Sequence, residues 1–177
     1  IGYVTIASVG NALDFGDLTN ARDNVGAAGS STRGVFAGGN DPAASNVVDF
    51  ITIATTGDAT DFGNLSAARY LPKGCSSAVR AVFGGGFTPS VSNVLDFITI
   101  ASTGNATDFG DMTDQLAKAG STSNATRGVW GGGEPTTNVI DFVTIASTGD
   151  ATNFGDLFSG RYGVDSLAGR TRGLFTG

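Results

Sequence analysis

The sequence predicts an all-β protein built from four copies of one antiparallel unit of four strands. The segment from Asn46 to Leu65 returns almost letter for letter at Asn93–Met112 and Asn138–Leu157, and a shortened copy opens the chain at Ile1–Leu18. A fixed period of this kind is typical of repeat architectures. The 28 glycines and the many Ser, Thr and Asn residues favour short strands joined by tight turns.

Equivalent residues give the length of the repeat. Phe15, Phe62, Phe109 and Phe154 are separated by steps of 47, 47 and 45 residues. The last step is shorter because the loop after the glycine pair has four residues in the third copy (Glu134–Thr137) and six in the two before it. We therefore expect a single domain over 1–177, with repeat units at about 1–39, 40–86, 87–133 and 134–177.

Each unit is expected to begin with a weak strand of small residues, followed by an apolar strand that ends in glycine. The first strands are placed near Val25–Gly29, Gly74–Ala78, Ala117–Ser121 and Val164–Ala168. The second strands read GVFAGG, AVFGGG, GVWGGG and GLFTG. Their terminal glycines let the backbone turn sharply or approach a neighbour closely.

The third strand, NVVDFITIAT in the copy that starts at Asn46, is rich in the β-branched and aromatic residues that strands prefer. A TGD or TGN turn connects it to the fourth strand, ATDFG. Apolar residues lie on both faces of the third strand, with Val47 and Ile51 on one face and Val48 and Phe50 on the other. A strand that is buried on both faces belongs between neighbouring sheets, which is the situation of a β-propeller blade.

The sequence begins in a third strand, at Tyr3–Ser8, and stops in a second strand, at Gly173–Gly177. We expect the N- and C-terminal strands to complete a fourth blade, which gives a closed four-bladed ring without open sheet edges. The alternative is a part of a larger ring, of roughly five to eight blades, or of a longer array. A start at Ile1 rather than at a methionine indicates a processed chain or a segment of a longer protein.

The order of these elements resembles the Kelch repeat. The most specific point of resemblance is the glycine doublet, at Gly38-Gly39, Gly85-Gly86 and Gly132-Gly133. The sequence departs from the Kelch pattern on the fourth strand, where Phe62 and its equivalents replace the expected Trp, and in Asp49-Phe50, which replaces the usual Tyr-Asp pair. The resemblance is to a divergent Kelch-like group, and repeated segments such as TIATTGDATDFGNL, at Thr52–Leu65, also resemble repeats of phage tail-fibre-like proteins. It implies a β-propeller fold.

Composition excludes several classes of function. The chain has a net charge of −6, with acidic residues spread along the repeats, so we expect no nucleic-acid partner and no membrane insertion. It contains no histidine and one cysteine, which excludes His-based zinc sites, Ser/His/Asp triads and Cys/His dyads. The carboxylates of TGDATDFGDL do not follow a known calcium loop and are interpreted as turn residues, so we expect no metal and no cofactor. Cys75 is expected to be a small buried strand residue, and Trp130 a core residue.

Candidate binding residues are sought where the copies differ. The turns after the third strands are near copies of one another, whereas the loops after the second and fourth strands are individual. Because these variable loops emerge at one face of a propeller, they predict a binding face. Its candidate residues are Arg22, Asp41, Arg69, Tyr70, Lys73, Phe87, Glu134, Arg161 and Tyr162. The alternative is that these loops vary because nothing constrains them.

The arginines allow two interpretations. Arg22, Arg69 and Arg161, a series interrupted by Leu116, either line the mouth of the ring and hold an anion or a sugar carboxylate, or pair with a recurring Asp and fix a loop. Arg33 and its equivalents Arg80, Arg127 and Arg172 lie in nearly invariant turns and are interpreted as structural, with Asp17, Asp111, Asp156 or free carbonyls as partners.

The function expected from these observations is non-enzymatic, with no catalytic residues. We expect a recognition or structural module in a virion tail or capsid, or outside a cell, that binds a host-surface glycan or protein or another virion protein through its variable loops. One alternative is a glycan-processing enzyme that uses Glu134, the only glutamate, together with an aspartate. Another is an extracellular adhesion or scaffold array. The sequence sets no oligomeric state.

Overall fold

The computed structural model describes residues 1–177 and confirms an all-β fold: three four-stranded antiparallel sheets and two separate strand pairs. The first sheet contains β3 (Gly26–Gly29), β4 (Arg33–Ala37), β5 (Val47–Thr52) and β6 (Thr60–Asn64). The second contains β7 (Lys73–Ser76), β8 (Arg80–Gly84), β9 (Val94–Thr99) and β10 (Thr107–Asp111). The third contains β11 (Gly120–Ser123), β12 (Arg127–Gly131), β13 (Thr137–Thr144) and β14 (Thr152–Arg161). The pairs are β1 (Gly2–Tyr3) with β2 (Leu13–Asp14), and β15 (Asp165–Ala168) with β16 (Gly173–Thr176).

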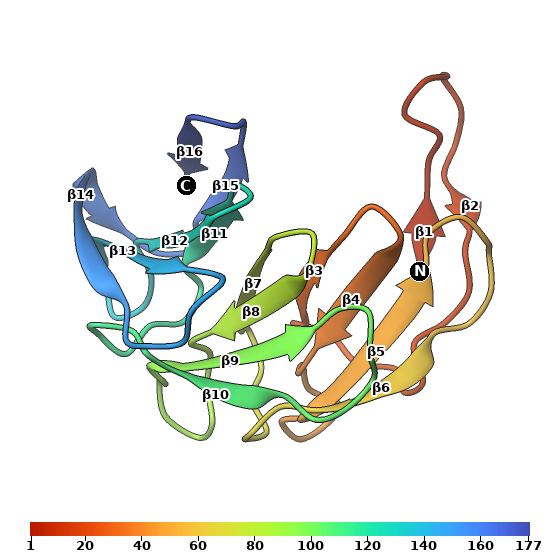
Figure 1. Cartoon of the computed structure of the whole chain (residues 1–177), viewed down its shortest axis with the longest axis horizontal. Coiled ribbons are helices and arrows are strands. Elements are labelled where there is room, and N and C mark those ends of the chain that lie inside the picture. The colour runs from red at the N-terminus through yellow and green to blue at the C-terminus, as the bar shows by residue number, and fades with distance from the viewer.

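The sheets follow one another along an open arc (Figure 1). The first strands of the units, β3, β7, β11 and β15, lie side by side from sheet to sheet, and the fourth strands β6, β10 and β14 lie on the outside of the arc. The pairs β1–β2 and β15–β16 stand at its opposite ends. The expected joining of these two pairs into a fourth sheet is not formed, because the arc leaves its two ends too far apart to pair.

The fourth strand of each complete sheet carries a β-bulge at its phenylalanine. In the first sheet Val48 pairs with Gly63 and Asp49 pairs with Asp61, so Phe62 has no partner residue on β5. The same shift leaves Phe109 and Phe154 without a partner in the other two sheets. A bulge re-aims a side chain relative to the pleat, and here it follows a repeated sequence.

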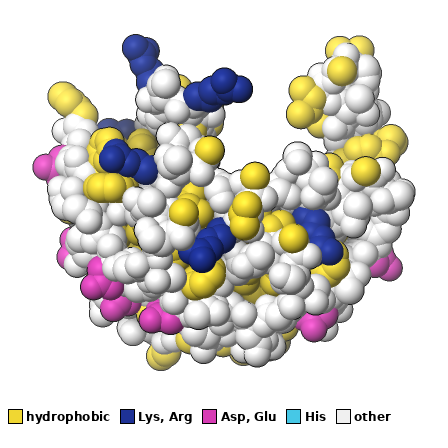
Figure 2. Space-filling view, in the orientation of Figure 1, with side chains coloured by type: hydrophobic (Ala, Val, Ile, Leu, Met, Phe, Trp, Pro, Cys, Tyr) yellow, Lys and Arg dark blue, Asp and Glu magenta, His cyan; other side chains and the backbone are white.

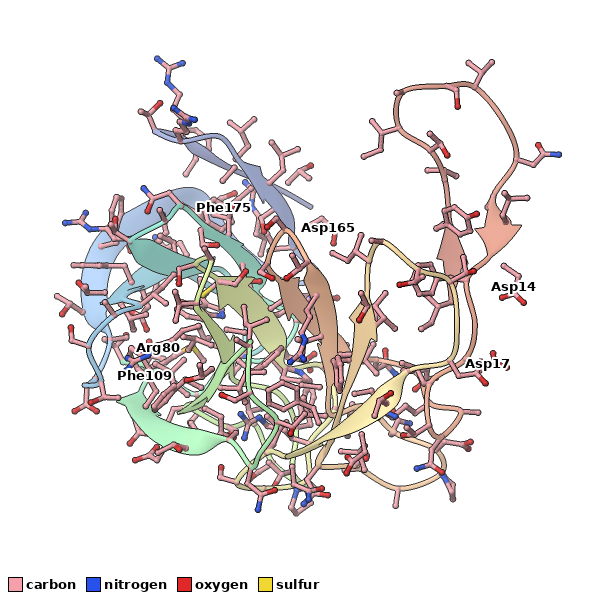
Figure 3. The ribbon with its side chains drawn as sticks, turned by 45° about the vertical axis from the view of Figure 1, so that its right-hand side comes forward. Asp14, Asp17, Arg80, Phe109, Asp165 and Phe175 are labelled. Carbon is pink, nitrogen blue, oxygen red and sulfur yellow. The ribbon has the colours of Figure 1, made fainter.

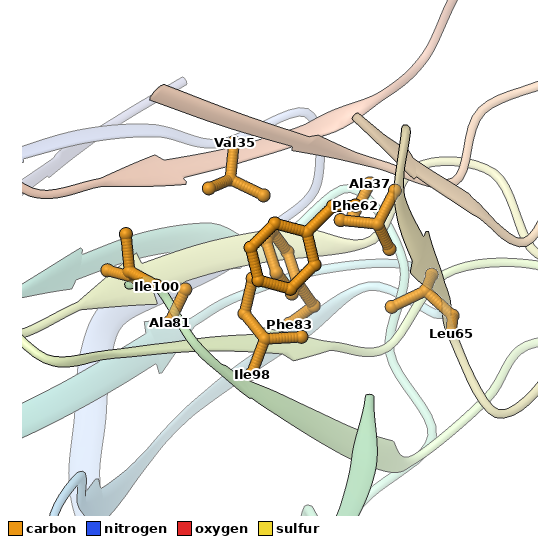
Figure 4. Packing of buried hydrophobic residues seen from close by; sticks show 9 residues of the cluster. Val35, Ala37, Phe62, Leu65, Ala81, Phe83, Ile98 and Ile100 are labelled. Atoms are coloured by element: carbon orange, nitrogen blue, oxygen red, sulfur yellow. The ribbon is translucent and has the colours of Figure 1, made fainter. Parts of the chain in front are cut away.

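The core lies between the sheets. One cluster is made by Phe62, Leu65 and Val48 of the first sheet against Ile98, Ile100 and Phe83 of the second (Figure 4). The next cluster packs Leu95 and Phe109 of the second sheet against Trp130 and Val143 of the third. Strand β9 therefore contributes Ile98 to one core and Leu95 to the other, which confirms burial on both faces for the third strand of the middle sheet.

The repeated TGD and TGN turns connect each sheet to the one before it. Gly57 donates its N–H to the Phe15 carbonyl at 2.7 Å, and Gly104 and Gly149 bond Phe62 and Phe109 in the same way. The side chains of Asp58, Asn105 and Asp150 accept backbone N–H groups of the preceding fourth strand, at 2.9–3.1 Å. These contacts explain why the turns are nearly identical, and they agree with the interpretation of the carboxylates as turn residues.

The bounds differ from the expected ones at several places. The N-terminal third strand, expected at Tyr3–Ser8, is limited to Gly2–Tyr3, because β2 is its only partner strand. Strand β14 continues to Arg161, into residues that were expected to form a variable loop. The first strand of the third sheet begins at Gly120, three residues after the expected start at Ala117, because the preceding residues form the loop that holds Lys118. Second strands end before their glycine doublets, whose φ angles are positive (67° and 104° at Gly38 and Gly39). Trp130 and Cys75 are buried as expected.

Candidate functional site

The variable loops gather at one end of the sheets. In an antiparallel sheet of sequential strands, alternate connections emerge at opposite ends. The connections β4–β5, β8–β9 and β12–β13 therefore share one end with the segments that lead from β2, β6, β10 and β14 to the next unit. The other end carries the repeated turns.

At the variable end, the pairing of each first and second strand continues beyond the glycine doublet as one isolated bridge. Tyr70 and Phe87 exchange two backbone hydrogen bonds, of 3.1 and 2.9 Å. The equivalent bridges join Asp23 to Asn40 and Ala117 to Glu134. Three positions with the same backbone arrangement thus present three different pairs of side chains.

The bridge in the second sheet is aromatic and lies next to a charged group. The rings of Tyr70 and Phe87 stack with their centroids 5.3 Å apart. The Lys118 ammonium lies 5.9 Å from the Phe87 ring centre and 5.7 Å from the Tyr162 ring centre, and it forms an ion pair of 2.6 Å with Glu134. We call Tyr70, Phe87, Lys118, Glu134 and Tyr162 the aromatic–lysine cluster.

Electrostatics keep Lys118 charged. The hydrogen bond from its ammonium to Glu134 raises the pKa of Lys118, desolvation is the next largest effect and lowers it, and the Glu134 charge adds to the increase. Both side chains of the ion pair are more than one third exposed. The cluster therefore combines a half-buried stack of two rings, a tyrosine that is 58% exposed, and a charged pair of hydrogen-bonding groups.

Two of the candidate arginines are structural in this arrangement. Arg22 pairs with Asp49 at 2.8 Å and Arg69 pairs with Asp96 at 2.9 Å, and all four side chains are almost completely buried. Burial lowers the pKa of Arg69, while the charge and hydrogen bond of Asp96 oppose that shift. This geometry matches the alternative in which the arginine pairs with a recurring Asp and fixes a loop.

The remaining candidates are dispersed. Arg161 donates to the Gly177 carbonyl at 3.2 Å and to the Ser159 hydroxyl at 2.9 Å. Asp41 is exposed and lines a recess of about 440 Å³ together with Asn20 and Asn46, apart from the cluster. Lys73 lies in β7, and its carbonyl accepts the indole N–H of Trp130.

At the opposite end of the sheets, arginines hold the frame. Arg33 lies over the Phe50 ring at 4.4 Å and donates to the Ile100 carbonyl of the next sheet at 2.9 Å. Arg80, labelled in Figure 3, repeats this arrangement with Phe97 and with the carbonyls of Ile145 and Ala146. Of the two kinds of partner expected for these arginines, aspartates or free carbonyls, Arg33 and Arg80 use carbonyls. Figure 2 shows Lys and Arg groups along the concave side of one face and acidic groups toward its outer edge.

The sequence did not single out Lys118 as a site residue. Its equivalents are Asn24 and Leu71, and all three have positive φ angles of 54° to 58°. The available signal was a lysine in a variable loop of a chain that has only two lysines.

Comparisons with known proteins add no family to this picture. A scan against protein-family models gave no match, and a search of curated proteins found no significantly similar sequence. No helix of the chain could span a membrane. No group of three or more His, Cys, Asp or Glu side chains is arranged to hold a metal ion.

Proposed function

We propose that the chain is a non-enzymatic recognition module that binds a glycan at the aromatic–lysine cluster. The observation that carries the proposal is the stacked Tyr70–Phe87 pair beside the Lys118–Glu134 ion pair, on loops that differ between otherwise repeated units. Binding sites commonly combine apolar surface with a few oriented polar groups.

The chemistry of the cluster suits a sugar. The exposed Tyr162 ring offers a flat apolar surface to the C–H face of a pyranose, and its hydroxyl group remains free to hydrogen bond. Lys118 donates hydrogen bonds and Glu134 accepts them, so the pair can bind the hydroxyl groups of a neutral sugar. The partner, in this proposal, is a host-surface glycan.

The wider setting of the proposal is a Kelch-like β-propeller displayed on a virion, in the tail or capsid, or outside a cell. Four-stranded sheets packed face to face along an arc, with their first strands innermost, support the propeller. Mass spectrometry of purified particles for peptides of this chain tests the virion location.

The enzymatic alternative uses Glu134 as one of two catalytic carboxylates. Glycoside hydrolysis by such a pair needs carboxyl groups about 5 to 9.5 Å apart. The side chain of Glu134 is engaged in an ion pair with Lys118 at 2.6 Å, an arrangement that suits ligand binding better than catalysis. Cleavage of a bound glycan that is lost in a Glu134→Gln variant would favour this alternative.

The test is a glycan array followed by calorimetry on the glycans that bind. Tyr162→Ala and Lys118→Gln are each expected to weaken binding by about tenfold or more, because they remove an exposed ring and the central donor. Thr56→Ala, in an exposed repeated turn, is the matched control and should bind like the parent chain. The proposal fails if no glycan binds, or if both cluster variants bind as well as the control.

A further inference from the structure

The strand pairs β1–β2 and β15–β16 each have an open edge where the complete sheets have a paired strand. By sequence position β15 and β16 are the first and second strands of a unit, and β1 and β2 are the third and fourth. Within one chain the pairs stand at opposite ends of the arc, as Asp14 and Phe175 show in Figure 3. We propose that β15–β16 of one copy pairs with β1–β2 of a second copy, so that copies join head to tail through a four-stranded sheet.

The complete sheets define the register of this junction. In the first two sheets the second and third strands pair with the same register, for example Val35 with Phe50 and Val82 with Phe97. The repeat carries these positions onto Leu174 of one copy and Tyr3 of the other. The full predicted register is Arg172 with Thr5, Gly173 with Val4, Leu174 with Tyr3, Phe175 with Gly2, and Thr176 with Ile1.

Apolar side chains that are buried between the complete sheets are exposed at the two ends. Phe154 is 54% exposed, whereas its equivalents Phe62 and Phe109 are 3% and 2% exposed. Ile6 is 98% exposed, whereas its equivalents Ile100 and Ile145 are 2% and 1% exposed. In the two complete cores these phenylalanines and isoleucines pack against one another across the sheet boundary. The junction would bury Phe154 of one copy against Ile6 of the next.

Each end also has a recess where the complementary strands belong. A cavity of about 300 Å³ is lined by Phe154, Phe175 and Ile140 at the C-terminal end of the arc. A second recess, of about 640 Å³, is lined by Phe36, Leu18 and Val25 at the N-terminal end. The two recesses lie on opposite faces of the repeated unit. The C-terminal recess of one copy is therefore suited to face the N-terminal recess of another copy, and not a second C-terminal recess.

Polar groups at the ends lack partners that their equivalents have. Arg33 and Arg80 donate to Ile100 and Ile145 of the following sheet, whereas Arg127 is exposed and has no such acceptor. The equivalent acceptor is the Ile6 carbonyl of the second copy. Likewise, the carbonyls of Phe15, Phe62 and Phe109 accept an N–H from a turn glycine, and Gly10 of the second copy would supply it to Phe154.

One position departs from the pattern. Gly2 stands where the complete sheets carry the buried Asp49, Asp96 and Asp141, so Arg161 would gain no ion pair across the junction. The boundary between the second and third sheets shows that such an ion pair is dispensable, because Leu116 stands there in place of the arginine. An aspartate introduced at Gly2 would restore the ion pair with Arg161, so this substitution is expected to strengthen the association of two copies.

Head-to-tail pairing closes a ring when the rotation per copy fits, and otherwise continues as a filament. Two copies supply six complete sheets and two junction sheets, eight in all, which lies within the roughly four to eight blades of known propellers. The open arc in Figure 1 therefore favours a ring of two copies.

The first experiment is sedimentation velocity of the chain over a wide concentration range. We expect reversible association that is weakened about 100-fold or more by Phe154→Asp, which places a charge in the junction core. Val79→Asp is the matched control, since Val79 is 60% exposed in a turn away from both ends. Gly2→Asp is expected to strengthen association about threefold to tenfold through Arg161.

The second experiment identifies the contact. One chain carries Leu174→Cys and another carries Tyr3→Cys, and the two are mixed under mild oxidation. A disulfide between the two chains is expected, and neither chain should link efficiently to itself. The proposal is overturned if the chain stays monomeric at high concentration, if Phe154→Asp associates like the control, or if a chain with both cysteines links only within itself.

Discussion

Phe109→Ala is expected to destabilise the chain by about 3–5 kcal/mol, the range of buried Phe→Ala changes. Phe109 is 2% exposed, packs edge-on against Phe97 with the ring centres 5.8 Å apart, and faces Val143 and Ile145 of the next sheet. Truncation removes this contact and leaves a cavity between the second and third sheets, because their backbones are fixed by the turn that follows β13.

The repeat provides a matched control in Phe154→Ala. Phe154 makes the same edge-on contact, with Phe142 at 5.8 Å, but its side chain is 54% exposed and no following sheet covers it. Since full burial of a Phe side chain contributes about 1.5–3 kcal/mol, removing a half-exposed one is expected to cost about 1 kcal/mol. Comparing the two variants therefore separates two contributions to the free energy of unfolding: packing between adjacent sheets, and packing of the phenylalanine within its own sheet.

The assay is urea unfolding followed by far-UV circular dichroism and by the fluorescence of Trp130, the only tryptophan, which lies in the core that Phe109 joins. Measurements are made at concentrations where the chain does not associate, so that Phe154 stays exposed. Equal losses of stability in the two variants would refute the assignment of the main core to the space between sheets.

Three further predictions use single positions. Gly110→Ala should cost about 1–3 kcal/mol more than Gly155→Ala in urea unfolding. Both glycines have a positive φ, but a Cβ at Gly110 would lie 2.6 Å from the backbone of the next sheet, whereas one at Gly155 would meet no atom within 4 Å. Glu134→Gln should lower the pKa of Lys118, read from its side-chain carbon shift in an NMR titration, because the variant loses the negative charge and the charge-assisted hydrogen bond that raise this pKa; an unchanged pKa would contradict the ion pair. Burial raises the pKa of the Cys75 thiol, so a disulfide reagent should modify it only after unfolding, and rapid reaction of the folded chain would contradict its burial.

The strand order and the burial of the central third strand, β9, on both faces could be predicted from the sequence, because both follow from local periodicity. The open arc could not, since the rotation between sheets depends on how side chains such as Phe83 and Trp130 fill the space between them. The aromatic–lysine cluster was predicted in part. Tyr70, Phe87, Glu134 and Tyr162 were found by their variability, but the place of Lys118 among them depends on contacts with residues of its own unit and of the next one.

The arginines illustrate the same limit. A recurring Arg and a recurring Asp predicted an ion pair, yet the sequence alone did not identify which aspartates take part. The partners of Arg22 and Arg69 lie 27 residues further along the chain, on the third strand of the next sheet. Only the packing of adjacent sheets brings them together, and it turns two candidate ligand-binding groups into buried structural ones.

The bridge beyond each glycine doublet has a consequence for how new specificity can arise. The hydrogen bonds of these bridges use backbone atoms alone. The same backbone geometry therefore carries three different pairs of side chains, Asp23–Asn40, Tyr70–Phe87 and Ala117–Glu134. A change in either residue of a pair alters the chemistry displayed without disturbing the packing beneath it. Recombination between such similar units would exchange whole bridges, so the side chains exposed at the variable end can change while the fold of the sheets stays the same.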